Sequence, residues 1–403
     1  MDFDLAIIGA GPAGLSFALS LRDSGLKIVV IEKLSRTDLA DPPIDGRDIA
    51  LTHLSRRLMQ QHGSWQRVDP DLISPIQRAQ VIDGDSPYTL DFDTPSDDTD
   101  ALGFIISNHL IRKAIYEEFE TLQNVTLMDQ RIVTQVSTDD EAGQLTLDDG
   151  TQLKVNLIVA ADTRFSDTRR QMGISAGSYD FGRSAVLCWM DHEVSHEQTA
   201  FECFHYGRTL AMLPLAGNRS SAVITVPTPQ VNELLNMSEE AFNLDIENRL
   251  GGQLGRMTQV GERFTYPLVG VHANRFYTRR FALIGDAAVG MHPVTAHGFN
   301  LGLSGQDLLS EGIIKAVQQG QEYWQTGLLQ HYQHQHMLST RPLYHGTNSV
   351  VTLFTNDSFP ATLLRKAVLR LSNNLPPVKW AITQKLMTKN HVKLTLPGLL
   401  GRG

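Results

Sequence analysis

Three glycines near the N-terminus have the spacing that brings a main chain close to a phosphate. Gly9, Gly11 and Gly14 form the pattern G-x-G-x-x-G between an apolar run and a helix-like segment, and Glu32 ends the next apolar run. In this pattern the first glycine makes the turn, the second admits a pyrophosphate and the third lets helix and strand pack closely. An acid after the second strand accepts hydrogen bonds from a ribose. The four residues predict a dinucleotide site at a helix N-terminus.

A second stretch, GDAAVGMHPVTAHGFNLG at residues 285–302, places an acid, two histidines and a proline among side chains too small to fill a core. Asp286 follows the strand-like run FALI, and Asp162 ends another such run, VNLIVAAD. Small residues leave the main chain open to a neighbour. The stretch therefore exposes an unusual length of main chain, as a glycine-rich loop with an ordinary helix cap would also do.

The surrounding pattern indicates an α/β protein with two sheets. DLAIIGAG, PAGLSFALSLRDSG and KIVVIEK read as a βαβ unit, and VTLMDQRIVTQVS, QLTLDDG, VNLIVAAD and FALIGDAA as further strands. Alternating segments between Asp162 and FALI (SAVLCWMDHEV, AFECFHYG, TLAMLPLAG and SSAVITVP) predict a mostly antiparallel sheet. An acidic, turn-rich segment, DGDSPYTLDFDTPSDDTDALG, predicts an exposed loop with a hairpin, and the chain after Gly302 is mainly helical in pattern.

Composition excludes several classes of protein. With 403 residues, 41% hydrophobic and 20% charged, the chain is long enough for two domains. Its net charge of −9 argues against nucleic acid as a partner, and its two cysteines favour a reducing, cytoplasmic location. The acidic N-terminus is unlike a secretory signal, and no run is apolar for the ~20 residues of a spanning helix.

Separated motifs together resemble those of the FAD-dependent aromatic hydroxylases, and most of all the ubiquinone-biosynthesis ring hydroxylases. They are IDGRDIALTHLSRRLMQQHGSW, LGFIISNHLIRKAI, LIVAADTRFSDTRR and GDAAVGMHPVTAHGFNLG, and they occur in the family's order over nearly the whole chain. The resemblance implies a fold like that of p-hydroxybenzoate hydroxylase: a Rossmann-type FAD domain, a mixed β-sheet substrate domain and C-terminal helices.

Residues in these motifs match family positions that hold FAD. Asp286 would bind the ribityl chain of the flavin, and the N–H groups of a helix starting near Gly298 and Asn300 would face the flavin N1/O2 edge. Asp162, Arg47 and Arg112 match further cofactor positions, the two arginines near the phosphates.

The resemblance also implies the reaction, hydroxylation of a polyprenyl phenol or quinol of the demethoxyubiquinol type. O₂ would react through a C4a-hydroperoxyflavin after reduction by NAD(P)H, on a face lined by His292 and Pro293. Candidates for a base that ionises the phenol are His205, Tyr206 and His297, although alternation between core and solvent explains the first two equally well.

Three positions depart from the family pattern. Thr163 stands where a glycine usually follows Asp162, which weakens the inference of hydride delivery by NAD(P)H. His297 replaces a glutamine beside the flavin, and Val289 replaces a histidine.

Other functions stay open. An FAD-dependent reductase of a lipid or a non-catalytic flavoprotein scaffold would share the FAD motifs, whereas the tryptophan-rich motif of the halogenases is absent. His331, His334 and His336 in HYQHQH have no nearby carboxylate, so we expect a solvated helix face and no metal.

We expect an FAD-binding domain from residues 1–75, 100–180 and 270–350, a substrate domain from 76–99 and 181–269, and a basic helical segment at 351–403. This last segment holds eight basic residues and no acid after Asp357, with an amphipathic pattern in ATLLRKAVLRLSNNL. It predicts either peripheral contact with an anionic membrane, at the inner membrane face, or a helix packed on the FAD domain. A complex of quinone-biosynthesis proteins is a further possible partner.

Overall fold

The computed structural model describes residues 1–83, 89–94, 101–205, 207–291 and 297–354. Its first sheet has five parallel strands in the order β18-β11-β1-β2-β8, with the short strand β17 antiparallel at one edge. A hairpin of β9 and β10 extends antiparallel from β11. The strands are β1 (Phe3–Ile8), β2 (Ile28–Ile31), β8 (Val125–Met128), β9 (Val133–Thr138), β10 (Gly143–Leu147), β11 (Gln152–Ala160), β17 (Tyr277–Thr278) and β18 (Phe281–Leu283).

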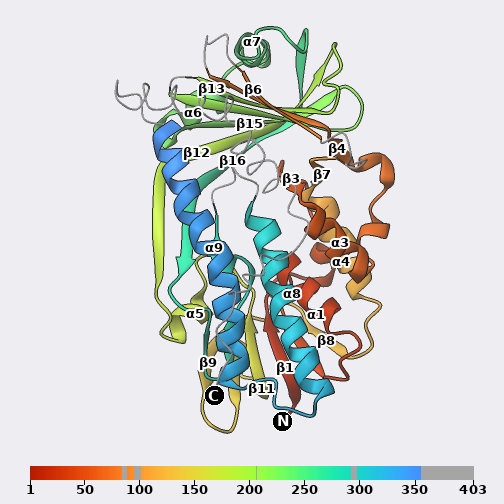
Figure 1. The fold of residues 1–403 in the computed structure, drawn as a ribbon, viewed down its shortest axis with the longest axis vertical. Helices are drawn as coiled ribbons and strands as arrows, with labels where there is room; N and C mark the ends of the chain where they lie inside the picture. Colours follow the sequence, from red (N-terminus) through yellow and green to blue (C-terminus); the bar gives the residue numbers. More distant parts are fainter. Residues whose placement is uncertain (84–88, 95–100, 206, 292–296, 355–403) are drawn as a thin grey trace, which may run out of the picture.

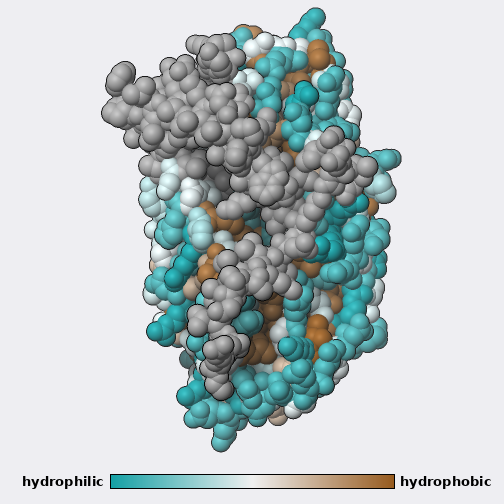
Figure 2. Space-filling view, viewed as in Figure 1, coloured by the Kyte–Doolittle hydropathy of each residue, from teal (hydrophilic) through white to brown (hydrophobic). Residues whose placement is uncertain are grey.

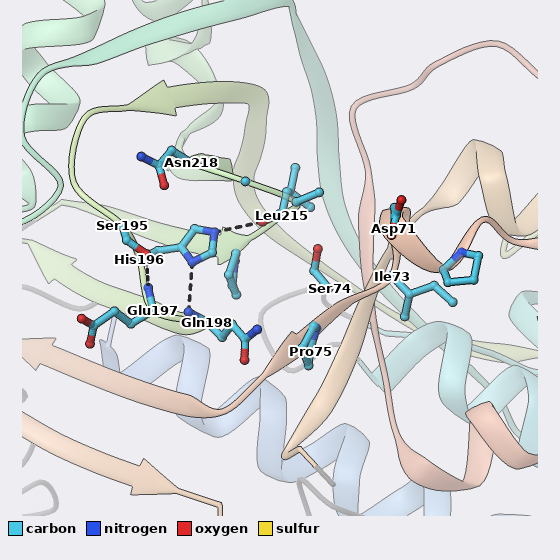
Figure 3. A pocket seen from close by; sticks show the side chains of 14 residues that line it. Asp71, Ile73, Ser74, Pro75, Ser195, His196, Glu197, Gln198, Leu215 and Asn218 are labelled. Atoms are coloured by element: carbon cyan, nitrogen blue, oxygen red, sulfur yellow. Dashed lines mark hydrogen bonds between the residues drawn. The ribbon is translucent and has the colours of Figure 1, made fainter.

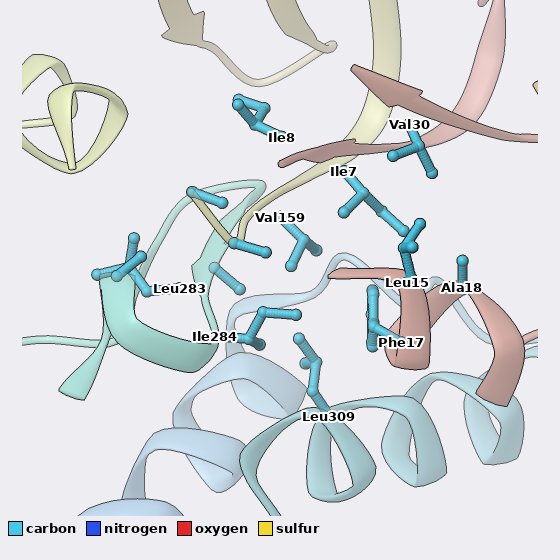
Figure 4. Close-up of a cluster of buried hydrophobic side chains, with 14 of the residues drawn as sticks. Ile7, Ile8, Leu15, Phe17, Ala18, Val30, Val159, Leu283, Ile284 and Leu309 are labelled. Atoms are coloured by element: carbon cyan, nitrogen blue, oxygen red, sulfur yellow. The ribbon is translucent and has the colours of Figure 1, made fainter. Parts of the chain in front are cut away.

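Helices pack against this parallel sheet because its central strands are apolar along their whole length. Pro12 stands at the first turn of α1, where its missing N–H costs nothing. Figure 4 shows side chains of α1 and α8 meeting those of β1, β2 and β11 in the main core. The helices of this part are α1 (Pro12–Ser20), α2 (Arg36–Ala40), α3 (His53–His62), α4 (Asn108–Phe119), α5 (Asp167–Gln171), α8 (His297–Gln318) and α9 (Thr326–Phe354), with 3-10 turns η1 (Trp65–Arg67), η2 (Pro70–Leu72) and η4 (Gly285–Ala287).

The second sheet has the order β19-β16-β12-β15-β14-β13-β5-β6 and is antiparallel except where β13 runs parallel to β5. Figure 1 shows it across the top of the molecule, with α7 above it and the parallel sheet and its helices below. Its elements are β5 (Arg78–Asp83), β6 (Thr89–Asp93), β12 (Ala176–His192), β13 (Thr199–His205), β14 (Arg208–Pro214), β15 (Arg219–Pro227), β16 (Met257–Ala273), β19 (Val289–Gly290), η3 (Thr228–Gln230), α6 (Val231–Leu235) and α7 (Glu239–Arg249).

The two faces of the second sheet have different neighbours. On the outer face, residues of β12 to β15 form a closed core with α6 and α7. The inner face packs on a small sheet of β3 (Asp48–Leu51), β7 (Gly103–Ser107) and β4 (Ser74–Ile76). The Trp189 indole Nε1 donates to Asp48 Oδ2 at 2.9 Å, and the Tyr266 hydroxyl donates to the Asp45 carbonyl at 2.7 Å. The segment around residues 45–51 therefore joins the two large sheets.

These observations confirm the predicted fold class. The predicted strands are present in both sheets. The segment predicted as an exposed loop with a hairpin contributes β6, which pairs antiparallel with β5 and has Leu90 and Phe92 buried, so that part is not exposed; residues 84–88 and 95–100 lie outside the described residues. The domain boundaries stay a prediction, and β12 and β16 run across two of them, at residues 181 and 269. Figure 2 shows hydrophilic residues around the margin of one face and hydrophobic residues nearer its middle. In the described part of the chain no helix has the length and apolar character to cross a membrane.

Candidate active site

The predicted cofactor residues lie at one edge of the parallel sheet. Gly9 follows β1, Glu32 follows β2, Asp162 follows β11 and Asp286 follows β18. These four strands are parallel and consecutive in the sheet, in the order β18-β11-β1-β2. Ligands of open α/β sheets bind in the crevice outside the carboxyl ends of the strands. The arrangement is thus that of a nucleotide crevice assembled from distant parts of the chain.

The glycine turn has the geometry that the spacing predicts. Gly9 has φ +106°, and a Cβ there would lie 2.7 Å from the carbonyl oxygen of Ala161. A Cβ on Gly14 would lie 2.1 Å from the carbonyl oxygen of Gly9, so helix and strand touch through their backbones. Gly11 differs because a Cβ there would meet nothing within 4 Å. The space over Gly11, at the N-terminus of α1, fits a pyrophosphate.

Glu32 is buried and held at the end of β2. One carboxylate oxygen accepts the N–H of Ala10 at 2.7 Å, and the other accepts the N–H of Leu34 at 2.9 Å. Each oxygen keeps a second acceptor position. The structure therefore fixes the carboxylate beside the glycine turn, and ribose binding stays a prediction.

The two predicted arginines lie in different places. Arg112 of α4 lines a small cleft with Ala10 and Pro12 of the glycine turn, which suits a phosphate contact. Arg47 bonds to Asp45 with Nη2 to Oδ2 at 2.6 Å, and its guanidinium lies 5.4 Å from the ring centre of Tyr266. Arg47 thus lies where the crevice side meets the second sheet.

Asp162 and Asp286 have contrasting environments. Asp162 Oδ2 accepts the hydroxyls of Ser166 and Thr168, both at 2.8 Å, while Oδ1 is closed to solvent and has no partner among the described residues. Burial raises the pKa of Asp162. Asp286 is 42% exposed and accepts from Arg164 Nη2 at 3.2 Å. An unpaired buried acceptor and an accessible carboxylate at the same edge both fit the hydroxyl groups of FAD.

The small residues of GDAAVG permit close packing of three segments. Gly285 has φ +58°, and a Cβ there would lie 2.7 Å from the Cβ of Ala13 in α1. A Cβ on Gly302 in α8 would lie 3.5 Å from the Cα of Gly285. The turn η4 is therefore packed between α1 and α8, with little room for larger side chains.

At the start of α8, the side chain of Asn300 is bonded within the protein, so any contact with the cofactor would come from its backbone. Its side-chain oxygen accepts from the Thr52 N–H at 3.0 Å and the Ser55 hydroxyl at 2.6 Å, and its amide donates to the Ala50 carbonyl at 2.8 Å. These bonds fix the first turn of α8 to β3 and α3. Gly298 has open space at its Cβ position, as a main chain facing a flavin requires.

The structure does not test the predicted roles of several catalytic candidates. His292 and Pro293 lie outside the described residues, as does Tyr206. His205 ends β13, but its side chain is not among those described. His297 is partly buried and is the first residue of α8, which keeps it a candidate beside the cofactor.

The expectation that the histidines of HYQHQH share a solvated helix face is wrong for His336. His336 does not face solvent: it is 1% exposed, its ring centre lies 5.7 Å from that of Tyr332 and 5.4 Å from that of Phe276, and it fills the space over Gly305. His331 and His334 are exposed, and the described residues contain no cluster of three metal-binding side chains. Thr163, which replaces the usual glycine after Asp162, is not among the non-glycine residues with positive φ, so its backbone has no strain of that kind.

Sequence reasoning also missed two partly buried acids near the second sheet. Asp48 accepts hydrogen bonds from Trp189 and Ser107, and burial raises its pKa. Glu202 lies in the middle of β13, and burial raises its pKa to about 8. The signal for Glu202 was present in AFECFHYG, where it is the one acid in an otherwise apolar alternation.

A separate hollow of about 670 Å³ opens at one end of the second sheet. Segments 70–75, 195–198 and 214–218 line it, and none of the crevice residues does. Figure 3 shows the His196 ring within it, bonded to the Leu215 carbonyl at 2.9 Å and to the Gln198 N–H at 3.0 Å. Because its imidazole is already paired within the protein, we assign no chemistry to this hollow.

Known proteins share both the sequence and the fold. The model of the FAD binding domain family matches residues 2–340. The ubiquinone hydroxylase UbiM of Neisseria meningitidis is 49% identical over 387 residues, covering 95% of this chain and 84% of that protein. The ubiquinone hydroxylase UbiL of Rhodospirillum rubrum is 33% identical over 376 residues, covering 93% and 87%.

Among solved structures, p-nitrophenol 4-monooxygenase PnpA of Pseudomonas putida has a TM-score of 0.77 at 17% identity, covering 97% of this chain and 99% of that one. This likeness supports the fold alone. The family match confirms FAD as the expected cofactor, and the solved structure confirms the expected fold. The chain belongs to the FAD binding domain family and is an FAD-dependent monooxygenase.

Proposed function

We propose that this monooxygenase hydroxylates the aromatic ring of a polyprenyl phenol or quinol in ubiquinone biosynthesis. The observation that carries the proposal is the 49% identity to a ubiquinone hydroxylase over 95% of the chain. Bound FAD would supply the two-electron activation of O₂ and the oxygen transfer to the ring. One oxygen atom would enter the ring, the other would leave as water, and NAD(P)H would provide the two electrons.

Residues of the chain would bind the cofactor and exclude water from the reacting ring. The glycine turn, Glu32 and Arg112 would hold the adenosine and phosphates, while Asp162 and Asp286 would hold the sugar-like chain of the cofactor. The inner face of the second sheet would form the apolar wall that excludes water from the ring, because its residues near β3 and β7 are hydrophobic.

The experiment is turnover of the FAD-loaded protein with NAD(P)H, ¹⁸O₂ and a short-chain prenyl phenol, followed by mass spectrometry. We expect one ¹⁸O atom in the product ring. Oxidation of NAD(P)H coupled to substrate reduction without ¹⁸O incorporation would favour a reductase. Failure of the flavin to be reduced or to react, with FAD fully bound, would favour a scaffold. Quinone profiling in a hydroxylase-deficient host would identify the ring position.

We also propose that the substrate reaches the enzyme from an anionic membrane surface, at the inner face of the membrane. The support is the basic segment after Asp357, although these residues lie outside the described structure. Each base near such a surface contributes about 1 kcal/mol. Changing Arg365, Lys366 and Arg370 together to Glu should abolish sedimentation with anionic vesicles and leave FAD content unchanged. Unaltered binding would make the segment structural. A complex with other quinone-biosynthesis proteins stays a secondary proposal.

A further inference from the structure

Glu202 points toward the inner face of the second sheet. Its strand neighbours Phe201 and Cys203 belong to the outer core with α6 and α7. Successive side chains of a strand point to opposite faces, so Glu202 lies on the other side, with Ala200. Ala200 packs in the same cluster as Ala50 of β3. The carboxylate is therefore on the face that meets the cofactor-binding part of the protein.

The surroundings of Glu202 on this face are apolar. Its register partners are Val81 on β5 and Ala211 on β14, and Val223 of β15 lies opposite Ala211. The Glu202 Oε1 atom is closed to solvent and has no hydrogen-bond partner among the described residues. Most buried polar atoms in proteins are hydrogen-bonded, so an unpaired carboxylate oxygen calls for a ligand or another explanation.

The inner face of the second sheet, which carries Glu202, is linked through β3 to the start of α8. The cluster that holds Ala200 and Val81 also holds Ala50. The Ala50 carbonyl accepts the side-chain amide of Asn300, in the first turn of α8, at 2.8 Å. Only β3 thus separates the wall that carries Glu202 from the helix terminus assigned to the flavin edge.

We propose that Glu202 binds the ring hydroxyl of the phenolic substrate and takes up its proton, an inference that rests on the proposed function. The phenol O–H bond breaks, a new O–H bond forms on the Glu202 carboxylate, and the electron pair stays on the phenolate oxygen. The ring becomes richer in electrons and is more readily hydroxylated. The proton returns to the hydroxyl of the product before release, so Glu202 is regenerated.

The chemistry of Glu202 suits this role. Burial raises the pKa of its carboxyl to about 8, much nearer to the value of about 10 for a phenol than an ordinary carboxylate is. The charged groups of neighbouring strands are engaged elsewhere: Arg78 with Asp93, Asp91 with Gln80, and Arg219 with Asp191. Asp83 stands at the register position of Phe204, and Asp83→Asn is therefore included in the test.

The apolar wall also selects the substrate class. None of the neighbours Val81, Ala211, Leu213 and Val223 carries a charge, so the immediate surroundings of Glu202 offer no cation for a ring carboxylate. Arg183 lies on the same face, by its register with Pro227, and donates to the Gly207 carbonyl at 3.0 Å. A phenol with hydrocarbon substituents fits, and its hydroxyl would be its main polar contact. We expect a carboxylated phenol to bind much more weakly than a short prenyl phenol.

The test uses FAD-loaded protein in its oxidised state and two probes, a short prenyl phenol and its methyl ether. Ultraviolet difference spectra report bound phenolate as a function of pH, independently of turnover. For the wild type we expect the bound phenol to ionise at lower pH than in solution. Glu202→Gln should remove this shift and weaken phenol binding about tenfold or more, since a buried bond to a charged group is lost. Binding of the methyl ether should be unchanged.

Control variants separate this role from structure. Glu262→Gln, an exposed position on β16 of the same sheet, should behave like the wild type. Should Glu202→Gln fail to fold or to hold FAD, Glu202→Asp keeps a carboxylate and should retain a phenolate signal that depends on pH. Unchanged phenolate formation in a folded Glu202→Gln protein, or its loss in Asp83→Asn instead, would overturn the proposal. If the wild type itself binds neither probe, the proposed function has failed as well.

Discussion

Substitution of Gly11 separates cofactor binding from folding more cleanly than any other change in the glycine turn. Gly11 has φ −72° and ψ 175°, an extended conformation that valine adopts readily, and its Cβ position is empty to 4 Å. We expect Gly11→Val to change the free energy of unfolding of the apoprotein by no more than about 0.5 kcal/mol. The valine methyl groups would occupy the space that we assign to the pyrophosphate.

The assay compares thermal unfolding with and without FAD. Ligand at 100 times its Kd stabilises the folded state by about 2.7 kcal/mol, and this gain should vanish in Gly11→Val together with the yellow colour. Gly177→Val is a matched control, because that glycine also has an open Cβ position, its nearest contact being 3.9 Å away, but it lies in β12. Gly14→Ala should instead destabilise the apoprotein by about 1–3 kcal/mol or more, since its Cβ would press on the Gly9 carbonyl. Retention of FAD by a folded Gly11→Val protein would refute the assignment of this turn.

Further expectations concern α8 and the second sheet. Asn300→Ala should lower the free energy of unfolding by about 2–3 kcal/mol, because the bonds to β3 and α3 are lost. It should also speed FAD release in stopped-flow experiments. If the variant is as stable as the wild type, these bonds contribute little. His297→Gln should lower the flavin midpoint potential and flatten the pH dependence of flavin reoxidation near neutrality, and an unchanged potential would assign this histidine to packing. The folded-state pKa of Glu202, about 8, lies above its unfolded value, so the stability it contributes is complete below about pH 4.3 and is lost as the pH rises toward 8. Glu202→Gln should therefore make Tm less sensitive to pH in this range, whereas Glu262→Gln should not.

The cofactor crevice could be predicted from sequence because its signals are local. Glycine spacing, apolar runs and the acids that end them each report on a few residues, and parallel pairing then places all the strand ends at one edge. Glu32, Asp162 and Asp286 were found in this way. Their separate environments, such as the unpaired Oδ1 of Asp162, depend on neighbours that no local pattern reveals.

The substrate side was harder to predict because alternation in a strand does not say which face is inner. Glu202 could be placed only once α6 and α7 were seen to cover Phe201 and Cys203. His336 shows the same limit in a helix. Its surroundings in HYQHQH are polar, but Gly305 of α8 leaves a space that the imidazole fills. Both assignments depend on contacts between residues far apart in the chain.

The position of β18 has a consequence for synthesis of the protein. This strand, Phe281–Leu283, lies beside β11, yet about 120 residues of the second sheet separate the two in the chain. A nascent chain that ends before it leaves residues 158–160 of β11 unpaired on one side, and exposed strand edges invite aggregation. The crevice also lacks Asp286 and the first turn of α8 until these residues have left the ribosome. FAD capture must therefore come late in biosynthesis, and cofactor supply can act on the yield of folded enzyme only after nearly three quarters of the chain is made.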